Sequence, residues 1–371
     1  MDKDELGAWL RLLLTPHVGP TLARKLLAAL GSPQAVFEAS ADTLARLVGS
    51  REVASLRSEP ADLAAQLAAT EAWLAQPGCH LLSLADARYP AALLEVGNPP
   101  LLLFAQGDLS LLQRPAVAVV GSRHPTAQGQ DNARAFAQAL AEAGVPVVSG
   151  LALGVDAAAH EGALAAVVGA STVAVVGTGL DVVYPRRHGG LQRRIGERGL
   201  LLSEFLLGTP ALAPNFPKRN RIVAALARGT LVVEAAVQSG SLITARLASE
   251  LGREVLAIPG SIHSPQSRGC HALIKQGAKL VETAQDVLEE LKLGVQVPQL
   301  GQLSLPDDPP EPAPDPDPVL RAMGFDPVSQ EALSARTGWG PAELGAHLLE
   351  LELMGQVARL PGQLFQRLAA A

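Results

Sequence analysis

Two kinds of apolar pattern alternate along the chain, and each predicts a different secondary structure. Up to about residue 75, apolar side chains recur at helical spacing, beginning with Trp9 and Leu13. A second helical run starts at Leu22 and stops at Gly31, a residue type that commonly ends helices. Residues 1–75 are therefore predicted to form a small helical domain.

The break between these two helices, Val18-Gly19-Pro20, has the form of a helix-hairpin-helix turn. A turn of this kind presents backbone N–H groups to a DNA phosphate. Proline has no N–H group, so Pro20 weakens that function. A structural role for the domain is favoured over direct contact with DNA, and both interpretations stay open at this point.

Between residues 80 and 292 the pattern changes to short apolar runs, each followed by a turn rich in glycine and then a helical stretch. Such runs are typical of parallel strands that helices cover on both faces. The region is therefore predicted to be a Rossmann-like, doubly wound α/β domain with a parallel sheet. Its predicted strands are residues 117–120, 145–148, 172–176, 200–202, 230–233 and 254–258.

The last part of the chain divides into an irregular segment and a compact one. Residues 296–317 are rich in proline and aspartate without periodicity, which predicts an extended linker. Residues 318–371 show a helix beginning at Ser329, a second opening at Pro341, and two short strand-like runs. Two helices followed by a hairpin predict a winged-helix-like domain.

Composition narrows the class of protein without identifying it. The 371 residues suffice for two or three domains, and the 48% apolar share is ample for their cores. No apolar run reaches the roughly 20 residues that span a membrane, and the polar start does not resemble a secretory signal. Cys79 and Cys270 fit a reducing cytosol. A cytoplasmic protein without a structural disulfide is expected.

The net charge of −6 argues only weakly against nucleic acid, because the charges are unevenly distributed. Acidic residues gather in the proline-rich segment, whereas basic residues gather between 186 and 198 and again between 218 and 221. A solvated face and a functional surface are about equally compatible with the first basic group.

Candidate binding residues lie in turns that follow the predicted strands. Ligands of a doubly wound sheet bind beyond the carboxyl ends of its strands. Glycine there permits close approach or an unusual φ angle, serine offers a hydroxyl near free N–H groups at helix N-termini, and arginine or lysine adds charge. The residues singled out are Gly121, Ser122, Arg123, Gly150, Phe216, Lys218, Arg219, Asn220, Arg221, Ser239, Gly240 and Ser241.

Several anion sites in a row suit a polymer of phosphates better than a single nucleotide. Phe216 adds an aromatic surface on which a base can stack, an interaction worth about 1–3 kcal/mol. The alternative for Phe216 is an ordinary core position. This edge of the sheet is therefore predicted to bind a nucleic acid strand.

Motifs for catalysis or cofactor binding are weak or missing. Gly177-Thr178-Gly179 lacks the third glycine of a dinucleotide fingerprint, and no Gly-Lys-Ser/Thr step of a phosphate-loop ATPase occurs. His263 and His271 lack a third ligand at zinc spacing. No cofactor and no metal are expected.

Two pairs of polar residues are compatible with either catalysis or structure. Asp156 and His160 stand four residues apart, which suits an Asp–His pair, but no nucleophile is evident beside them and a structural bond is favoured. Asp181 and Glu204 could be paired carboxylates, although carboxylates near strand ends more often order loops.

Ten motifs between about residues 80 and 285 together resemble the DprA/Smf family of recombination mediators in order and spacing. No single motif is specific, whereas ten in order are. They are Gly121-Ser122-Arg123, Ser149-Gly150-Leu151-Ala152, Gly154-x-Asp156, Ala159-His160, Gly179-Leu180-Asp181-x-x-Tyr184-Pro185, Ser203-Glu204, Phe216-Pro217-x-Arg219-Asn220-Arg221, Ser239-Gly240-Ser241-Leu242-Ile243-Thr244-Ala245, Gly252-Arg253-Glu254-Val255 and Pro259-Gly260. The flanks fit more loosely, as a sterile-alpha-motif or hairpin-like domain and a winged-helix-like domain.

The resemblance implies a binding protein rather than an enzyme. Proteins of this family bind single-stranded DNA, protect it during natural transformation and load a RecA-type recombinase, and single-strand-binding protein is a further implied partner. The implied DNA site comprises Ser122, Arg123 and residues 216–221. Leu153 and His271 depart from the family pattern, which usually has Arg and Asn at these places.

The resemblance also implies a homodimer through the Rossmann-like domain. Leu273, Ile274 and Leu280 are predicted to fall on or near one face of an apolar helix that forms this contact. Ordinary core packing is an equally good explanation of the same pattern.

Two other functions fit parts of the sequence. A nucleotide-processing enzyme of the phosphoribohydrolase type shares a Rossmann-like fold, but it needs a Pro-Gly-Gly-x-Gly-Thr loop where this chain has Ser239-Gly240-Ser241. A winged-helix regulator of duplex DNA needs a basic recognition helix, whereas residues 341–352 carry three acids and no lysine or arginine.

Overall fold

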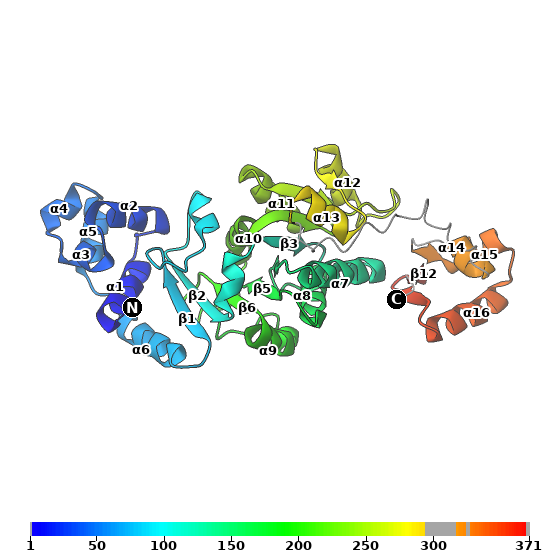
Figure 1. Cartoon of the computed structure of the whole chain (residues 1–371), viewed down its shortest axis with the longest axis horizontal. Helices are drawn as coiled ribbons and strands as arrows, with labels where there is room; N and C mark the ends of the chain where they lie inside the picture. The colour runs from blue at the N-terminus through cyan, green and yellow to red at the C-terminus, as the bar shows by residue number, and fades with distance from the viewer. Residues whose placement is uncertain (1, 294–316, 324–326, 369–371) are drawn as a thin grey trace, which may run out of the picture.

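The computed structural model describes residues 2–293, 317–323 and 327–368 (Figure 1). The extended linker predicted at 296–317 lies outside these residues, apart from Asp317. The helical unit lies at one end of the molecule, the large sheet in the middle and the winged-helix-like unit at the other end (Figure 1).

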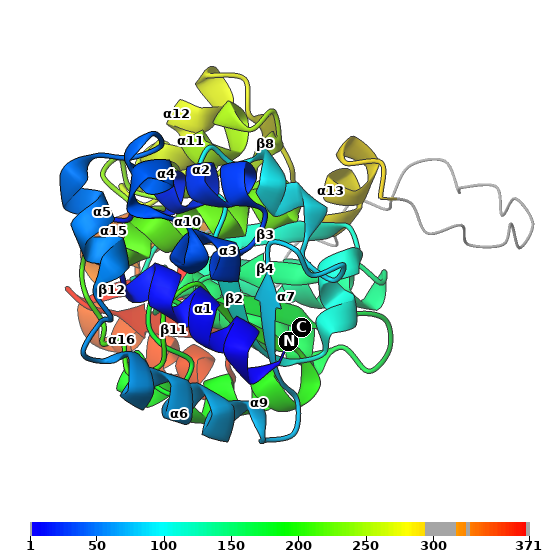
Figure 2. The ribbon, with the colours of Figure 1, turned by 90° about the vertical axis from the view of Figure 1, so that its left-hand side faces the viewer.

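The N-terminal unit is helical, as predicted, and packs against the first strands of the sheet (Figure 2). Its helix α2 ends at Gly31, where a φ of 91° is one that favours glycine. The ring of Trp73 meets that of Phe104 edge-on at 5.8 Å, which joins this unit to the sheet. The helices are α1 (Lys3–Leu14), α2 (Pro20–Leu30), α3 (Pro33–Glu38), α4 (Ala41–Ala45), α5 (Ser50–Arg57) and α6 (Leu63–Leu74).

The central sheet contains the six predicted strands, and they run parallel to one another. The sheet has nine strands in the order β1-β2-β6-β5-β4-β3-β7-β8-β9. The strands are β1 (Cys79–Ser83), β2 (Leu102–Gly107), β3 (Ala116–Val120), β4 (Val147–Ser149), β5 (Thr172–Val175), β6 (Leu200–Ser203), β7 (Ala227–Val232), β8 (Glu254–Ala257) and β9 (Lys279–Leu280).

Two strands that were not predicted extend the parallel sheet at one edge. Strands β1 and β2 pair antiparallel, and β2 pairs antiparallel with β6. A long segment with the short 3-10 helix η1 (Ala91–Glu95) connects β1 and β2. Because hairpins are recognised in a sequence by short turns, this long connection gave no signal for the pair.

Helices cover both faces of the sheet (Figure 1). Helices α7 (Ala127–Glu142), α8 (Val155–Ala165) and α9 (Gly189–Arg198) lie on one face. Helices α10 (Asn215–Leu226), α11 (Ser241–Glu250) and α12 (Arg268–Lys275) lie on the other, and α13 (Ala284–Glu290) packs against α7. These helices bury Leu, Val and Ala side chains against the strands.

The chain direction across the sheet reverses next to β3. From β3 the chain moves outward through β4, β5 and β6, and it then returns to the other side of β3 as β7 and continues to β8. Ligands of such sheets bind at this switch point, outside the carboxyl ends of the strands. The turns after β3 and β7 are therefore the place to look for a site.

The proposed dimer residues do not share one helix. Leu273 and Ile274 are half-buried on α12, but α12 ends at Lys275 and Leu280 is an exposed residue of strand β9. Gly277, with a φ of 103°, separates the two elements. The prediction of a single helical face is thus wrong for Leu280, because a left-handed turn is not visible in the apolar spacing.

The C-terminal unit has the predicted winged-helix arrangement with its own apolar core. Ser329 caps α15 and Gly338, with a φ of 76°, ends it. Strand β10 was not predicted, and it joins the hairpin β11–β12. Gln366 donates to Gln128 of α7 at 3.1 Å. The elements are α14 (Pro318–Met323), β10 (Val328–Ser329), α15 (Gln330–Thr337), α16 (Pro341–Leu353), β11 (Val357–Leu360) and β12 (Leu364–Arg367).

Among the helices of the described part of the chain, none combines the length and the apolar character that crossing a membrane requires.

Candidate nucleic-acid interface

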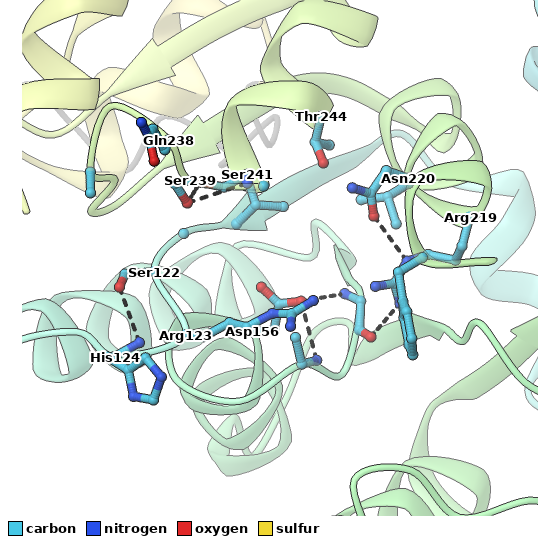
Figure 3. Close-up of a pocket in the computed structure, with 18 of the residues that line it drawn as sticks. Ser122, Arg123, His124, Asp156, Arg219, Asn220, Gln238, Ser239, Ser241 and Thr244 are labelled. Atoms are coloured by element: carbon cyan, nitrogen blue, oxygen red, sulfur yellow. Dashed lines mark hydrogen bonds between the residues drawn. The ribbon is translucent and has the colours of Figure 1, made fainter. Parts of the chain in front are cut away.

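A cavity of about 550 Å³ opens at the switch point between β3 and β7. Figure 3 shows Ser239, Ser241 and Thr244 on one side of it and Ser122, Arg123 and Asp156 on the other. Ten of the twelve candidate residues line it, whereas Lys218 and Arg221 do not. The ten are Gly121, Ser122, Arg123, Gly150, Phe216, Arg219, Asn220, Ser239, Gly240 and Ser241.

The turn after β3 presents an exposed cation to the cavity. A Cβ atom on Gly121 would lie 2.7 Å from a methyl carbon of Val155, so only glycine fits between the turn and α8. The Ser122 hydroxyl accepts a hydrogen bond from the backbone N–H of His124 at 3.0 Å. Ser122 therefore shapes the turn. The expectation that it sits at a helix N-terminus is wrong. Arg123 is exposed, and its guanidinium lies 6.0 Å from the centre of the Phe216 ring.

A buried carboxylate accepts hydrogen bonds from the backbone of the turn after β4. Asp156 accepts hydrogen bonds from the backbone N–H groups of Gly150 and Ala152 at 3.1 and 3.3 Å. Between them Leu151, which is buried, takes a φ of 57°, a conformation that strains any residue other than glycine. Burial is the main influence on Asp156 and raises the pKa of its carboxyl, while nearby Arg219 acts in the opposite direction.

Arg219 is a structural residue rather than a free charge. Its side chain is only 4% exposed, and it donates to the carbonyl oxygens of Gly150 and Val175. Burial lowers the pKa of its guanidinium to about 10, a value that still leaves it charged at neutral pH. Arg219 was singled out as a charge for binding, but its donors are used by backbone carbonyls, one of them in the turn after β4.

Arg221 is engaged within the protein, as Arg219 is, whereas Lys218 is exposed, as Arg123 is. Arg221 forms an ion pair with Glu204, and both side chains are largely buried. The expectation of a free cation is therefore wrong for Arg221 too. Lys218 is exposed at the start of α10, on the helix that also carries Phe216, but outside the lining of the cavity. Of the four candidate cations, Arg123 and Lys218 are thus the exposed ones.

In both pairs of polar residues that were compatible with catalysis, the two members have separate structural roles. His160 bonds through Nδ1 to the Thr172 hydroxyl at 2.7 Å, whereas Asp156 holds the turn after β4. Asp181 accepts from the backbone N–H of Gly208 at 2.8 Å, and Glu204 pairs with Arg221. Both carboxylates order loops, as the sequence favoured.

An aromatic pair borders the cavity. The rings of Phe216 and Tyr184 lie 5.3 Å apart, Phe216 is half-buried and Tyr184 is 43% exposed. Phe216 is therefore not a closed core position, and it lines the cavity. A smaller cavity of about 70 Å³, lined in part by Leu153 and Pro185, continues beyond this pair. No role was predicted for Tyr184, although its motif was recognised.

The turn after β7 places two hydroxyls at the N-terminus of α11. The Ser239 and Ser241 hydroxyls lie 2.7 Å apart, and the N–H groups of Ser241, Leu242 and Ile243 donate to acceptors of Ser239 and Gly240 within the turn at 3.1 to 3.4 Å. A Cβ atom on Gly240 would meet nothing within 4 Å. None of Gly121, Gly150 and Gly240 has a positive φ, so the expected unusual backbone is absent at these three positions. Close neighbours leave no room for a side chain at Gly121 and Gly150. Gly240 instead borders open space at a helix N-terminus, which suits an anion.

Sequence reasoning missed several residues that line the cavity, among them Gln238, Thr244 and Gln266. Thr244 stood inside a recognised motif, so a helical projection from Ser241 could have found it. Gln266 comes from the loop after β8, for which the sequence offers no signal. In the described residues 2–293, 317–323 and 327–368 no three His, Cys, Asp or Glu side chains are grouped as a metal site.

Comparisons with known proteins identify close relatives of this chain. The sequence model of the family described as DNA recombination-mediator protein A matches residues 80–292, and that of the DprA winged helix domain matches residues 304–363. Protein Smf of Escherichia coli is 44% identical over 294 residues, 78% of this chain and 78% of that protein. DNA processing protein DprA of Streptococcus pneumoniae is 51% identical over 210 residues, 57% of this chain and 73% of that protein.

Two solved structures are similar as well. The X-ray structure of DprA from S. pneumoniae superposes with a TM-score of 0.66 at 40% identity and covers 78% of this chain and 98% of that one. DNA processing protein A from Helicobacter pylori, a structure described for its single-stranded DNA binding mode, superposes with a TM-score of 0.53 at 31% identity. It covers 58% of this chain and 96% of that one.

Proposed function

This chain belongs to the DNA recombination-mediator protein A family, the DprA/Smf proteins, and from that premise we propose that it binds single-stranded DNA in the cavity between β3 and β7. The observation that carries the proposal is the juxtaposition of exposed Arg123, the Phe216 ring and the N-terminus of α11 with its Ser239 and Ser241 hydroxyls around one cavity. Arg123 and the helix N-terminus attract phosphates, and Phe216 offers a stacking surface.

The binding is not sequence-specific. Stacking on an aromatic ring and contact with phosphates depend little on which base is present. The protein protects the bound strand and helps to load a RecA-type recombinase, with single-strand-binding protein as a further partner. It acts as a homodimer through Leu273, Ile274 and the neighbouring β9 residue Leu280, and it carries out no catalysis. Its place of action is the cytoplasm.

One titration series tests the proposal. Gel shifts with a labelled single strand, competed by unlabelled single strand, duplex or mononucleotide, should show displacement by single strand at the lowest concentration. Arg123→Ala should weaken binding to poly-dT and to mixed strands alike. It should also lower the slope of log K against log salt by about 0.7, the value for one phosphate contact on a single strand.

The matched control is Arg228→Ala. It removes an exposed arginine at the start of β7, at the end of the strand opposite to the cavity. If Arg123→Ala kept the affinity and salt slope of the wild type in a folded protein, the DNA would have to lie elsewhere.

A further inference from the structure

A row of exposed arginines continues from the rim of the site along α9. The short 3-10 helix η3 (Arg186–His188) follows Tyr184 and Pro185, which line the small cavity next to Phe216. His188 bonds through Nδ1 to the carbonyl oxygen of Leu151, in the turn after β4, at 3.1 Å. The beginning of α9 is thereby fixed to the rim of the proposed DNA site.

Packing decides which side of α9 faces solvent. Leu191 and Ile195 are buried against the rest of the domain, which leaves Arg187, Arg194 and Arg198 exposed. Arg194 and Arg198 are four residues apart on α9 and share one side of that helix, and Arg187 lies on η3, directly before α9.

The charges of these three arginines are not neutralised locally. Within residues 2–293 no carboxylate lies within 4 Å of any of them, and the acid of α9, Glu197, stands 3.8 Å from Arg193 instead. Like charges four residues apart on a helix repel one another. A polyanion lying on this side of α9 would remove that repulsion.

We propose that the sugar–phosphate backbone of the bound strand leaves the cavity past Tyr184 and runs along Arg187, Arg194 and Arg198. This inference rests on the proposed function and extends the footprint on the strand. The ten residues of α9 span about 15 Å. At about 3.4 Å per stacked nucleotide, this length adds about four nucleotides to the footprint.

The experiment is a length series of poly-dT from about five to about twenty nucleotides, with affinity read by fluorescence anisotropy on the full chain. The test variant is Arg194→Ala/Arg198→Ala. The control is Arg51→Ala/Arg228→Ala, which removes the same charge from exposed positions on α5 and β7. All four side chains are solvent-exposed, so neither variant should alter the melting temperature.

The test variant should bind the shortest strands as the wild type does and lose about tenfold in affinity for the longest, with a salt slope lower by about 1.4 for two lost contacts. Affinity should stop rising with length about four nucleotides earlier than in the wild type. A second measurement uses Arg194→Cys, which can be labelled selectively because Cys79 and Cys270 are buried. Only long strands should change the emission of that label.

Equal losses on short and long strands, no loss on either, or the same loss in the control would each overturn the proposed path. A loss confined to duplex DNA would overturn it as well. Failure of the wild type to bind the shortest strands, or insensitivity of that binding to Arg123→Ala, would instead overturn the proposed cavity site. The two failures are therefore distinguishable.

Discussion

At the scale of single residues, the site divides its polar groups between those that meet solvent and those that hold the turns. Arg123 and Lys218 are exposed, whereas Arg219 and Asp156 are buried under the turn after β4. Both kinds of residue occur in the family motifs, so a motif alone does not say which side chain reaches a ligand. Substitutions at the two kinds of position should have different consequences.

Lys218→Ala and Arg219→Ala are predicted to separate affinity from stability. Removing Arg219 leaves the carbonyl oxygens of Gly150 and Val175 without their donors, which should cost about 2–4 kcal/mol of unfolding free energy. Lys218→Ala should leave the melting temperature unchanged and weaken strand binding modestly. Thermal and denaturant unfolding check the first outcome, and anisotropy checks the second. A fully stable Arg219→Ala variant would contradict the structural role.

Phe216→Ala is predicted to lower strand affinity by about 1–3 kcal/mol while the salt slope stays as in the wild type. The reason is that a stacked ring contributes no charge, in contrast to Arg123. The ring is half-buried against Gly177, so some loss of melting temperature is expected too, and affinity must be measured on folded protein. Phe216→Tyr serves as the control and should keep the affinity. Unchanged affinity in folded Phe216→Ala would mean that the ring only packs.

At the scale of elements, a histidine on α8 makes the sheet sensitive to acid. The Thr172 hydroxyl donates to the carbonyl of Val147 and must therefore accept from the Nδ1–H of His160. Its Nε2 is buried without a partner. Burial is the main cause that lowers the pKa of His160 to about 3 from 6.5, with further lowering by the charge of Arg219.

The pH dependence follows from the sign of this shift. Below pH 6.5 His160 is protonated in the unfolded chain but stays neutral in the folded protein. The free energy of unfolding is therefore at its full value above pH 6.5 and declines as pH falls toward 3. The loss is on the order of 4 kcal/mol over that interval. His160→Asn keeps a donor for Thr172 and should flatten the dependence. Denaturant unfolding at several pH values between 7 and 4 measures it, and parallel curves for the two proteins would refute the assignment.

At the scale of the whole molecule, the winged-helix-like unit is expected to be dispensable for strand binding. It has its own core, and its helix α16 carries three glutamates without an arginine or lysine. A chain ended after residue 295 should keep its affinity for single strands and its dimeric mass in light scattering. In the full chain, Ile274→Asp should give a monomer, because the charge falls on the proposed contact. Loss of binding on truncation would place the winged-helix-like unit in the site.

Much of this architecture was predictable from the chain itself. Continuous apolar runs such as 117–120 predicted the parallel strands, because only strands covered on both faces have such a pattern. Glycines and prolines such as Gly31 and Pro341 marked helix ends through their own backbone preferences. The position of the site followed from the order of strands and turns, since ligands of doubly wound sheets bind at the carboxyl edge.

What only the tertiary structure decided was the surroundings of each side chain. Arg123 and Arg219 are the same residue type in equally recognisable motifs, yet one is exposed and the other buried, because the turn after β4 folds over α10. The antiparallel β1–β2 pair and the break between Ile274 and Leu280 also depended on contacts between distant segments. Local sequence determines backbone preference and apolar spacing, whereas burial, and with it the charge available to a ligand, depends on what packs against each residue from elsewhere in the chain.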